Sequence, residues 1–319
     1  MMTNRPRIGI TLGDPRGIGP EVTASALEAR VDAGIDVRII GPTGLGDPGA
    51  RLDELGTWET IGDWSPDGGA RLAGQLSAAA IESAVRLVTS GALDGIVTAP
   101  ISKAALRAAG YPYPGHTEFL RELTGVPEVT MMMSAERTPL GGPLRVALIT
   151  AHIPLREVAG AVTSELIERR TAIAVDALRA WWGIPRPRVA FAGLNPHAGE
   201  GGLFGDEEAR VLQPAAERIG ERDDVEVLGI FPADTVFRQT IEGRADVVVT
   251  PYHDVGLAVL KTIARDEGVN VTAGLPFPRT SPDHGTALDI AGTGLADPGA
   301  MTAALDLCVR FCSTGVTVS

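Results

Sequence analysis

The histidines of this sequence are its clearest candidates for chemistry. Each follows a short apolar run or lies in a loop rich in glycine, proline, asparagine or aspartate, and the set is His116, His152, His197, His253 and His284. An imidazole can transfer protons near neutral pH or bind a divalent metal ion. A single histidine usually has a packing role, but five in such loops are difficult to assign to packing.

Three of these histidines share a position relative to a predicted strand. His152, His197 and His253 come shortly after the runs LRVALIT, PRVAFAG and ADVVVT. There is no local HxH or HExxH spacing, so a metal site would have to be assembled from separate loops. Three imidazoles without a thiolate suit a catalytic zinc or a similar divalent ion that keeps an open coordination position.

Basic and polar residues follow the last of these histidines. Lys261 lies eight residues beyond His253, Asn270 lies in the next predicted strand, and Arg279 follows in GLPFPRTS. Lysine and arginine suit a phosphate or carboxylate, and asparagine can orient a hydroxyl group; surface ion pairing is the alternative. Only two of the 28 basic residues are lysines, Lys103 and Lys261, which favours a role for a compact ammonium group.

Glycine-rich segments offer further candidate ligand sites. GLGDPG matches the dinucleotide fingerprint, but Asp47 and Pro48 interrupt it and no second strand ending in an acidic residue follows, so we expect a surface loop. GDPRGIGPE (13–21) and TAPISKAAL (98–106) each pass from a strand through a turn into a helix. Such turns either hold an anion or only make a tight connection.

The elements that must position these residues alternate between β-branched runs and helical stretches. This pattern predicts an α/β protein with a mostly parallel central sheet. The clearest helices are 69–89 and 163–182, and 42–69 is expected to be a surface excursion. The predicted strands are 7–12, 37–41, 94–99, 129–134, 144–150, 187–193, 225–230, 245–250 and 269–274.

Length and composition narrow the class of protein. The 319 residues predict two lobes, which we place at 1–127 with 273–319 and at 128–272. The net charge of -12 argues against nucleic acid or an anionic membrane as the main partner. The first residues lack an export signal and no long apolar run occurs, so we expect a cytoplasmic protein. The two cysteines, Cys308 and Cys312, are too few for a disulfide framework.

Taken together, these segments resemble the 4-hydroxythreonine-4-phosphate dehydrogenase family of vitamin B6 synthesis. The motifs that carry the resemblance, in the family's order, are GDPRGIGPE, TAPISK, GHTEFL, LNPHAGEGG, FPADT, YHDVGLAVLK, GVNVTAGLPF and RTSPDHGTALDIAG. The last motif also resembles the adenosine-binding segment of isocitrate and isopropylmalate dehydrogenases. The resemblance implies their fold, with two α/β/α lobes and an active-site cleft between them. It also implies a homodimer whose active site takes residues from both subunits.

The resemblance further implies roles for individual residues. His152, His197 and His253 match the ligands of a divalent metal, which could be zinc, cobalt, manganese or magnesium. The substrate-binding positions are His116, Thr117, Lys261, Asn270 and Arg279. Gly285 and Asp289 would lie near the adenosine of NAD or NADP, and Asp234 and Lys261 are the candidates for proton transfer.

The implied reaction is oxidation of the 3-hydroxyl group of 4-phosphohydroxy-L-threonine by NAD, followed by loss of carbon dioxide to give 3-amino-2-oxopropyl phosphate. Three residues depart from the family pattern: Arg16 replaces an alanine, Pro251 a methionine and Val255 a glutamine. They leave open a paralogous dehydrogenase of 4-phospho-D-threonate or 4-phospho-D-erythronate. An aromatic dihydrodiol dehydrogenase and a non-catalytic metabolite-binding protein are less favoured, because GHTEFL, Arg279 and the three histidines are retained.

Overall fold

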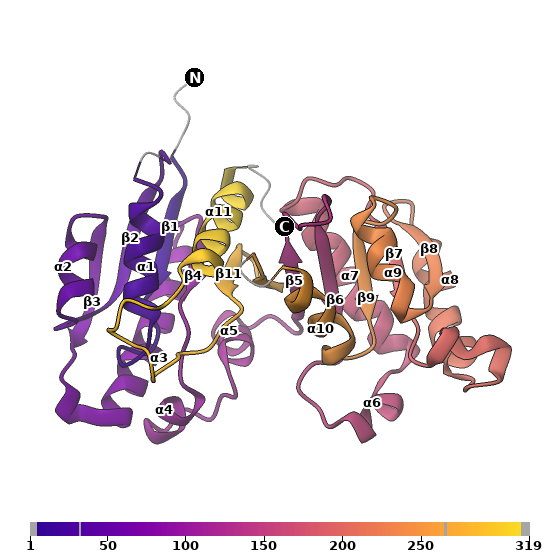
Figure 1. Cartoon of the computed structure of the whole chain (residues 1–319), viewed down its shortest axis with the longest axis horizontal. Helices are drawn as coiled ribbons and strands as arrows, with labels where there is room; N and C mark the ends of the chain where they lie inside the picture. Colours follow the sequence, from indigo (N-terminus) through magenta and orange to yellow (C-terminus); the bar gives the residue numbers. More distant parts are fainter. Residues whose placement is uncertain (1–4, 32, 265–266, 314–319) are drawn as a thin grey trace. The chain divides into compact units, whose positions relative to one another are not determined.

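The computed structural model describes residues 5–31, 33–264 and 267–313. The chain divides into two compact units, which Figure 1 shows in the colours of the sequence. Unit 1 holds the described residues up to Pro127 and those from Leu275 onward, and unit 2 is Glu128–Gly274. The chain therefore leaves unit 1, completes unit 2 and returns.

The sheet of unit 1 is parallel, in the strand order β3-β2-β1-β4-β11. Its central strands are apolar on both faces: Ile8, Ile39 and Ile96 are fully buried, as expected for a parallel sheet with both faces covered. The strands are β1 (Arg7–Thr11), β2 (Asp36–Thr43), β3 (Thr57–Asp63), β4 (Gly95–Thr98) and β11 (Arg279–Pro282).

Two groups of helices pack on this sheet. The alanine-rich α3 contacts β1 and β2 and also α4, whereas α11 contacts β4, β11 and α1. A Cβ atom on Gly74 of α3 would lie 2.0 Å from the carbonyl oxygen of Ala105, so glycine is what allows α4 to approach. The helices are α1 (Gly19–Glu28), α2 (Asp47–Asp53), η1 (Pro66–Gly68), α3 (Gly69–Thr89), α4 (Lys103–Ala108), α5 (His116–Thr124) and α11 (Gly299–Ser313).

The sheet of unit 2 is mixed, in the order β10-β5-β6-β9-β7-β8. β5 runs antiparallel to both of its neighbours, and the remaining pairs are parallel. The prediction of an α/β fold with a mostly parallel sheet is therefore confirmed. The strands are β5 (Thr130–Ala135), β6 (Leu144–Leu148), β7 (Arg188–Ala192), β8 (Glu226–Phe231), β9 (Val247–Thr250) and β10 (Val269–Ala273).

The helices of unit 2 bury apolar stripes against this sheet. Phe237 of α9 and Leu257 of α10 share a core with Val146 of β6. α7 contacts β5 and β6, and the Oγ1 atom of Thr163 caps it by accepting from the Leu166 N–H at 3.2 Å. The helices are α6 (Leu155–Ala161), α7 (Ser164–Ala180), η2 (Pro196–Gly202), η3 (Glu208–Leu212), α8 (Gln213–Gly220), α9 (Ala233–Ile241) and α10 (His253–Ile263).

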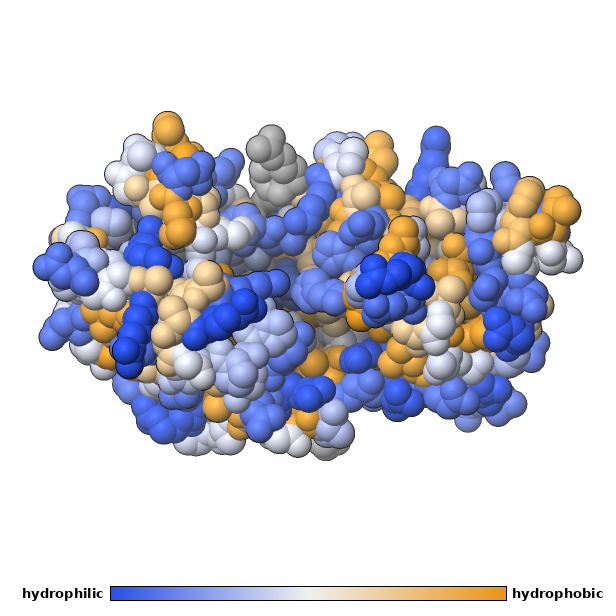
Figure 2. Space-filling model, turned by 90° about the horizontal axis from the view of Figure 1, so that it is seen from below, coloured by the Kyte–Doolittle hydropathy of each residue, from blue (hydrophilic) through white to orange (hydrophobic). Residues whose placement is uncertain are grey.

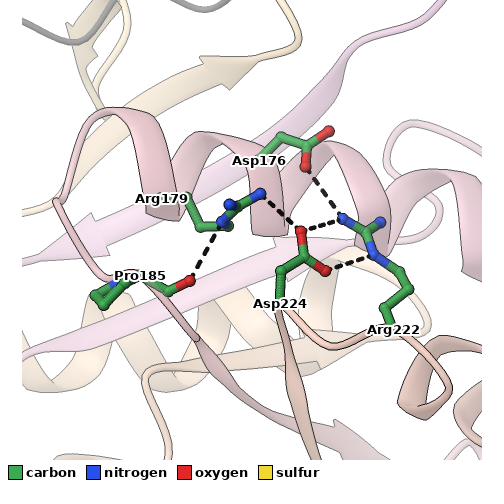
Figure 3. Close-up of polar contacts among 5 residues, drawn as sticks. All are labelled: Asp176, Arg179, Pro185, Arg222 and Asp224. Atoms are coloured by element: carbon green, nitrogen blue, oxygen red, sulfur yellow. Dashed lines mark hydrogen bonds and ion pairs between the residues drawn. The ribbon is translucent and has the colours of Figure 1, made fainter.

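Ion pairs fasten α7 to the segment that precedes β8, as Figure 3 shows. The Nη1 atom of Arg179 donates to the Oδ2 atom of Asp224 at 2.6 Å, and Arg222 donates to both carboxylate oxygens of Asp224, at 2.9 and 3.0 Å. Asp176 adds a longer contact to Arg222, at 3.3 Å. These pairs illustrate how arginine supplies most of the positive charge on this acidic chain. On the face viewed in Figure 2, hydrophilic residues are interspersed with smaller hydrophobic groups.

Two elements in one largely exposed stretch of unit 1 were not predicted. The stretch 42–69, expected to be a surface excursion, contains α2 and the edge strand β3. The GLGDPG segment within it leads into α2, with Gly46 at its N-cap at φ 64°. β11 was not predicted either, because it is short, begins with arginine and ends with proline.

Candidate active site

Unit 1 buries the guanidinium group of Arg279. This residue begins β11, beside β4, and is 2% exposed. Its Nε and Nη2 atoms donate to the Oγ1 atom of Thr98, at 3.1 and 2.6 Å. Burial lowers the pKa of Arg279 to about 9, so the group still carries its positive charge at neutral pH. A buried arginine of this kind is suited to a phosphate or carboxylate.

His116 interacts with that charge. It is the first residue of α5, and its Nε2 atom is buried with no hydrogen-bond partner among the described residues. Burial, and then the charge of Arg279, hold the pKa of His116 well below its ordinary range. The imidazole is therefore neutral at neutral pH and can donate to or accept from a ligand. Thr117 follows it and is half-buried.

The segment that contains Gly285 and Asp289 lies against the first glycine-rich turn. The N–H group of Ile18 donates to the carbonyl oxygen of Thr286 at 2.9 Å. A Cβ atom on Gly17 would lie 2.6 Å from the same oxygen, so this approach requires glycine. Gly285 and Asp289 are themselves exposed, and a ligand from solvent can reach them.

Arg16 forms an ion pair within that turn. Its Nε and Nη2 atoms donate to the two carboxylate oxygens of Asp14, at 3.0 and 2.7 Å, and the Asp14 side chain is fully buried. The arginine therefore compensates a buried negative charge. His284 adds a second histidine whose Nε2 atom is buried without a partner in the described part of the chain, while its Nδ1 atom contacts the Gly285 carbonyl oxygen at 3.0 Å.

In unit 2, the loops after β6 and β9 bring two histidines together. These strands pair in parallel, and beyond them the Oγ1 atom of Thr150 donates to the carbonyl oxygen of Pro251 at 2.7 Å. The ring centroids of His152 and His253 lie 5.7 Å apart as a result. The Nδ1 atom of His253 contacts the Oδ1 atom of Asp254 at 2.7 Å. A carboxylate in this place orients an imidazole so that Nε2 can bind a metal ion.

His197 lies in an unusual turn after β7. Residues His197 to Gly201 all have positive φ, including 53° at His197 and Ala198 and 43° at Glu200. This left-handed conformation costs a residue that has a Cβ atom roughly 1 to 2 kcal/mol. The ring centroid of His197 lies 6.1 Å from that of Phe204.

The three candidate metal ligands do not form one cluster. Across residues 5–31, 33–264 and 267–313, no group of three or more His, Cys, Asp or Glu side chains could hold a metal ion. The structure therefore brings His152 and His253 together without adding His197. The two imidazoles, one of them oriented by a carboxylate, are donors of the kind that divalent metals such as zinc accept, so this pair fits part of such a site.

The remaining candidates of unit 2 lie on separate elements. Lys261 is exposed on α10, the helix that begins at His253, and Asn270 of β10 has a buried Oδ1 atom without a partner in the described chain. Asp234 is exposed on α9. It borders a surface groove of about 400 Å³ that is lined largely by apolar side chains of α9 and α10, among them Ile263, and by none of the candidate histidines.

Comparison of the sequence with known proteins identifies a family. Residues 50–308 match the family model described as "Pyridoxal phosphate biosynthetic protein PdxA". The chain belongs to the PdxA family. A 4-hydroxythreonine-4-phosphate dehydrogenase of Burkholderia vietnamiensis is 43% identical to it, with 96% of each chain covered.

Solved structures agree with this membership. The crystal structure of the 4-hydroxythreonine-4-phosphate dehydrogenase of Klebsiella pneumoniae matches with a TM-score of 0.83 and 38% identity, covering 98% of this chain and all of that one. An isocitrate dehydrogenase of Methylococcus capsulatus, 18% identical with a TM-score of 0.55 over 97% of this chain and 88% of its own, shows the common fold. This PdxA family member is an oxidoreductase that acts on a hydroxyl group. None of the helices in its described part has the length and apolar character needed to cross a bilayer.

Sequence reasoning missed several residues that this PdxA family chain places around its candidates. Thr98 could have been suspected, because it is the first residue of TAPISK and lies near the end of the predicted strand 94–99. Asn195 and Glu208, which contact each other beside His197, gave no usable signal, because their contact joins residues 13 positions apart across an irregular loop.

Proposed function

We propose that this protein oxidises the 3-hydroxyl group of 4-phosphohydroxy-L-threonine with NAD, in the cytoplasm, and that the resulting β-keto acid loses carbon dioxide to give 3-amino-2-oxopropyl phosphate. The observation that carries the proposal is the near full-length similarity to proteins named 4-hydroxythreonine-4-phosphate dehydrogenase. NADP is the alternative acceptor of the hydride.

The substrate has two anionic groups, and Arg279 is the proposed partner for one of them. Its buried charge beside the neutral imidazole of His116 supports this role. A hydrogen bond to the His116 Nε2 atom would satisfy a polar atom that is buried without a partner among the described residues. Thr117 would add a hydroxyl group to the same ligand.

The polar groups of unit 2 are proposed to act on the reacting end of the substrate. Asn270 would orient a substrate hydroxyl through its buried Oδ1 atom. Lys261 and Asp234 are the candidates for moving the hydroxyl proton while the hydride passes to the nicotinamide. Lys261 is favoured, because it shares α10 with His253, whereas Asp234 borders a groove without candidate histidines. Gly285 and Asp289 would bind the adenosine of the dinucleotide.

His152, His197 and His253 would hold one divalent ion, zinc, cobalt, manganese or magnesium, which would supply Lewis-acid polarisation of the substrate oxygen. His152 and His253 are already neighbours, with ring centroids 5.7 Å apart. Asp254 orients the ring of His253 through Nδ1. His152 and His253 would therefore be preorganised for the ion before it binds.

A homodimer would complete this site. Two observations support it: His197 does not join the other two histidines within one described chain, and the groove along α9 and α10 exposes apolar side chains. The 63% exposed Leu140 borders that groove. A second copy of the chain could cover this surface and contribute a ligand.

A second substrate class is favoured by one observation near the histidines. Val255, at a position where the family has glutamine, packs against the apolar core of α9 and α10. It offers no hydrogen bond to a substrate amino group. Oxidation of 4-phospho-D-threonate or 4-phospho-D-erythronate, which carry a hydroxyl group instead, is therefore the alternative.

The test is NADH formation by the purified, zinc-loaded protein, offered 4-phosphohydroxy-L-threonine and 4-phospho-D-threonate in parallel. A higher kcat/KM for the amino acid phosphate supports the main proposal, and a higher value for the threonate supports the alternative. Loss of turnover in His152→Ala, with retained activity in a surface variant of unit 1 such as Arg86→Ala, at the exposed end of α3, would tie the reaction to the histidines. Turnover of neither substrate by metal-loaded protein would refute both.

A further inference from the structure

The turn that carries His197 has a backbone conformation that few residues adopt. Six consecutive residues, His197 to Gly202, have positive φ, and His197, Ala198 and Glu200 among them are not glycine. Such conformations persist only where surrounding contacts determine them, and they concentrate at functional sites. The contacts that hold this turn therefore indicate its purpose.

Glu208 supplies the main contact. It is 7% exposed and begins the π-helical turn η3. Its Oε1 atom accepts from the backbone N–H of Asn195 at 2.7 Å, and its Oε2 atom accepts from Asn195 Nδ2 at 2.9 Å. Glu208 thus holds the backbone N–H of the residue two positions before His197, and it shares the Nδ2 group of that residue with the Oε2 atom of Glu207, at 2.7 Å.

The Glu208 carboxylate also touches the far side of the turn. A Cβ atom on Gly199 would lie 2.8 Å from the Oε2 atom of Glu208, so the carboxylate packs directly on the backbone there. Backbone bonds also hold the turn: the Ala198 N–H donates to the Asn195 carbonyl oxygen at 3.1 Å, the Leu203 N–H to that of Glu200 at 3.3 Å and the Phe204 N–H to that of Gly199 at 3.2 Å. Glu208 therefore bridges the entry and the middle of the turn, with the imidazole-bearing residue between the two points.

We propose that Glu208, acting through Asn195, is a positioning residue that fixes the His197 imidazole for binding a divalent metal ion. The inference rests on the proposed function, in which His197 is a ligand. Burying a carboxylate and holding non-glycine residues in the left-handed region are both unfavourable. Both occur at the turn that presents His197, which a purely connecting loop does not require.

The sharpest perturbation is Glu208→Gln, which preserves volume but replaces one acceptor oxygen by an NH₂ group. At least one of the two Asn195 donors then loses its bond to residue 208, while Nδ2 keeps its bond to Glu207. We expect metal affinity to fall roughly 10- to 100-fold, the range seen when groups behind a metal ligand are removed. The readout is titration of the full-length metal-free protein with Co²⁺, followed by its visible absorption.

Glu136→Gln is the matched control. Glu136 is a half-buried carboxylate of the same unit that accepts from Ser134 at 2.6 Å, from Arg145 at 2.8 Å and from Trp182 at 2.8 Å. Its loss measures what a general weakening of unit 2 does to Co²⁺ binding. The inference requires that the change in log Kd for Co²⁺ caused by Glu136→Gln is less than about a third of the change caused by Glu208→Gln.

Hydrogen exchange provides an independent readout. In the metal-free Glu208→Gln protein, we expect the amides of residues 196–205 to exchange faster while those of β9 keep their protection. If Glu208→Gln fails to fold, Asn195→Ala serves instead, because it keeps the backbone bond to Glu208 and removes the Nδ2 bonds to Glu208 and Glu207.

His197→Ala distinguishes the role of His197 as a metal ligand from the positioning role of Glu208. If it binds Co²⁺ as tightly as the wild type, His197 is not a ligand, and both the metal assignment and this inference fall. If His197→Ala weakens binding but Glu208→Gln does not, or if Glu208→Gln and Glu136→Gln weaken it equally, only the positioning role is overturned.

Discussion

Replacing Arg279 by methionine should make the protein more stable while removing a ligand-binding charge. Burial lowers the pKa of Arg279 to about 9, well below its ordinary value. This difference corresponds to roughly 5 kcal/mol by which folding disfavours the charged group at every pH below the folded pKa. Loss of the two hydrogen bonds to Thr98 would remove roughly 1 to 3 kcal/mol of this gain. We therefore expect Arg279→Met to raise the free energy of unfolding by roughly 2 to 4 kcal/mol.

The assay is urea unfolding at neutral pH, followed by circular dichroism, with and without inorganic phosphate. Phosphate should stabilise the wild type and leave Arg279→Met unchanged, because ligand binding to the folded state is what raises its stability. Arg145→Met is the control of opposite sign. Arg145 is 8% exposed and pairs with Glu136 at 2.8 Å, so its removal leaves a carboxylate uncompensated and should lower the free energy of unfolding by roughly 2 to 4 kcal/mol. If Arg279→Met loses stability as Arg145→Met does, the charge is compensated within the fold and the reasoning is wrong.

Three further outcomes are expected. Arg222 and Arg179 hold the pKa of Asp224 below its ordinary value, so Asp224 stabilises the fold at neutral pH and stops doing so as pH falls through that lowered pKa. Asp224→Asn should therefore lower the free energy of unfolding by at most about 1 kcal/mol at neutral pH. In unfolding curves measured at decreasing pH, the difference in stability between the variant and the wild type should vanish at low pH. The pKa of His116 is lowered, so the unfolded chain takes up a proton that the folded chain does not, and the free energy of unfolding should decrease as pH falls below about 6.5. His116→Asn should flatten this part of the measured dependence of stability on pH. An unchanged slope would count against a neutral, buried His116. Dialysis against a chelator should abolish NADH formation and added Co²⁺ or Zn²⁺ should restore it, whereas full activity after chelation would exclude a required metal ion.

The sequence predicted most of the strands but not those without an apolar pattern. Each of the nine predicted strands is present, with ends within two residues of those predicted. β3 was missed because TWETIGD is an edge strand without a buried residue, in a glycine- and aspartate-rich stretch. β11 was missed because its four residues, RTSP, owe their burial to α11 and the neighbouring strand rather than to their own hydrophobicity.

The candidate site was predictable in residue type and in its place along the chain. The rule that ligands gather at the carboxyl ends of parallel strands is enough to expect His152 and His253 near each other. The partners of the candidates were not predictable, because they depend on contacts that local pattern does not encode. Arg279 donates a hydrogen bond to Thr98, which is 181 residues away in the sequence. Glu208 accepts from Asn195, on the other side of a left-handed turn.

Because lysine is scarce, amine-specific reagents can label very few side chains of this protein. Its side-chain amines are Lys103, at the start of α4 in unit 1, and Lys261, on α10 in unit 2, and both residues are exposed. An acylating reagent that modifies amines and spares guanidinium groups therefore places one reporter in each unit. Mass spectrometry of the two labelled peptides, with and without a candidate ligand, would measure how far the ligand protects the lysine of each unit from acylation. The measurement needs no engineered residue.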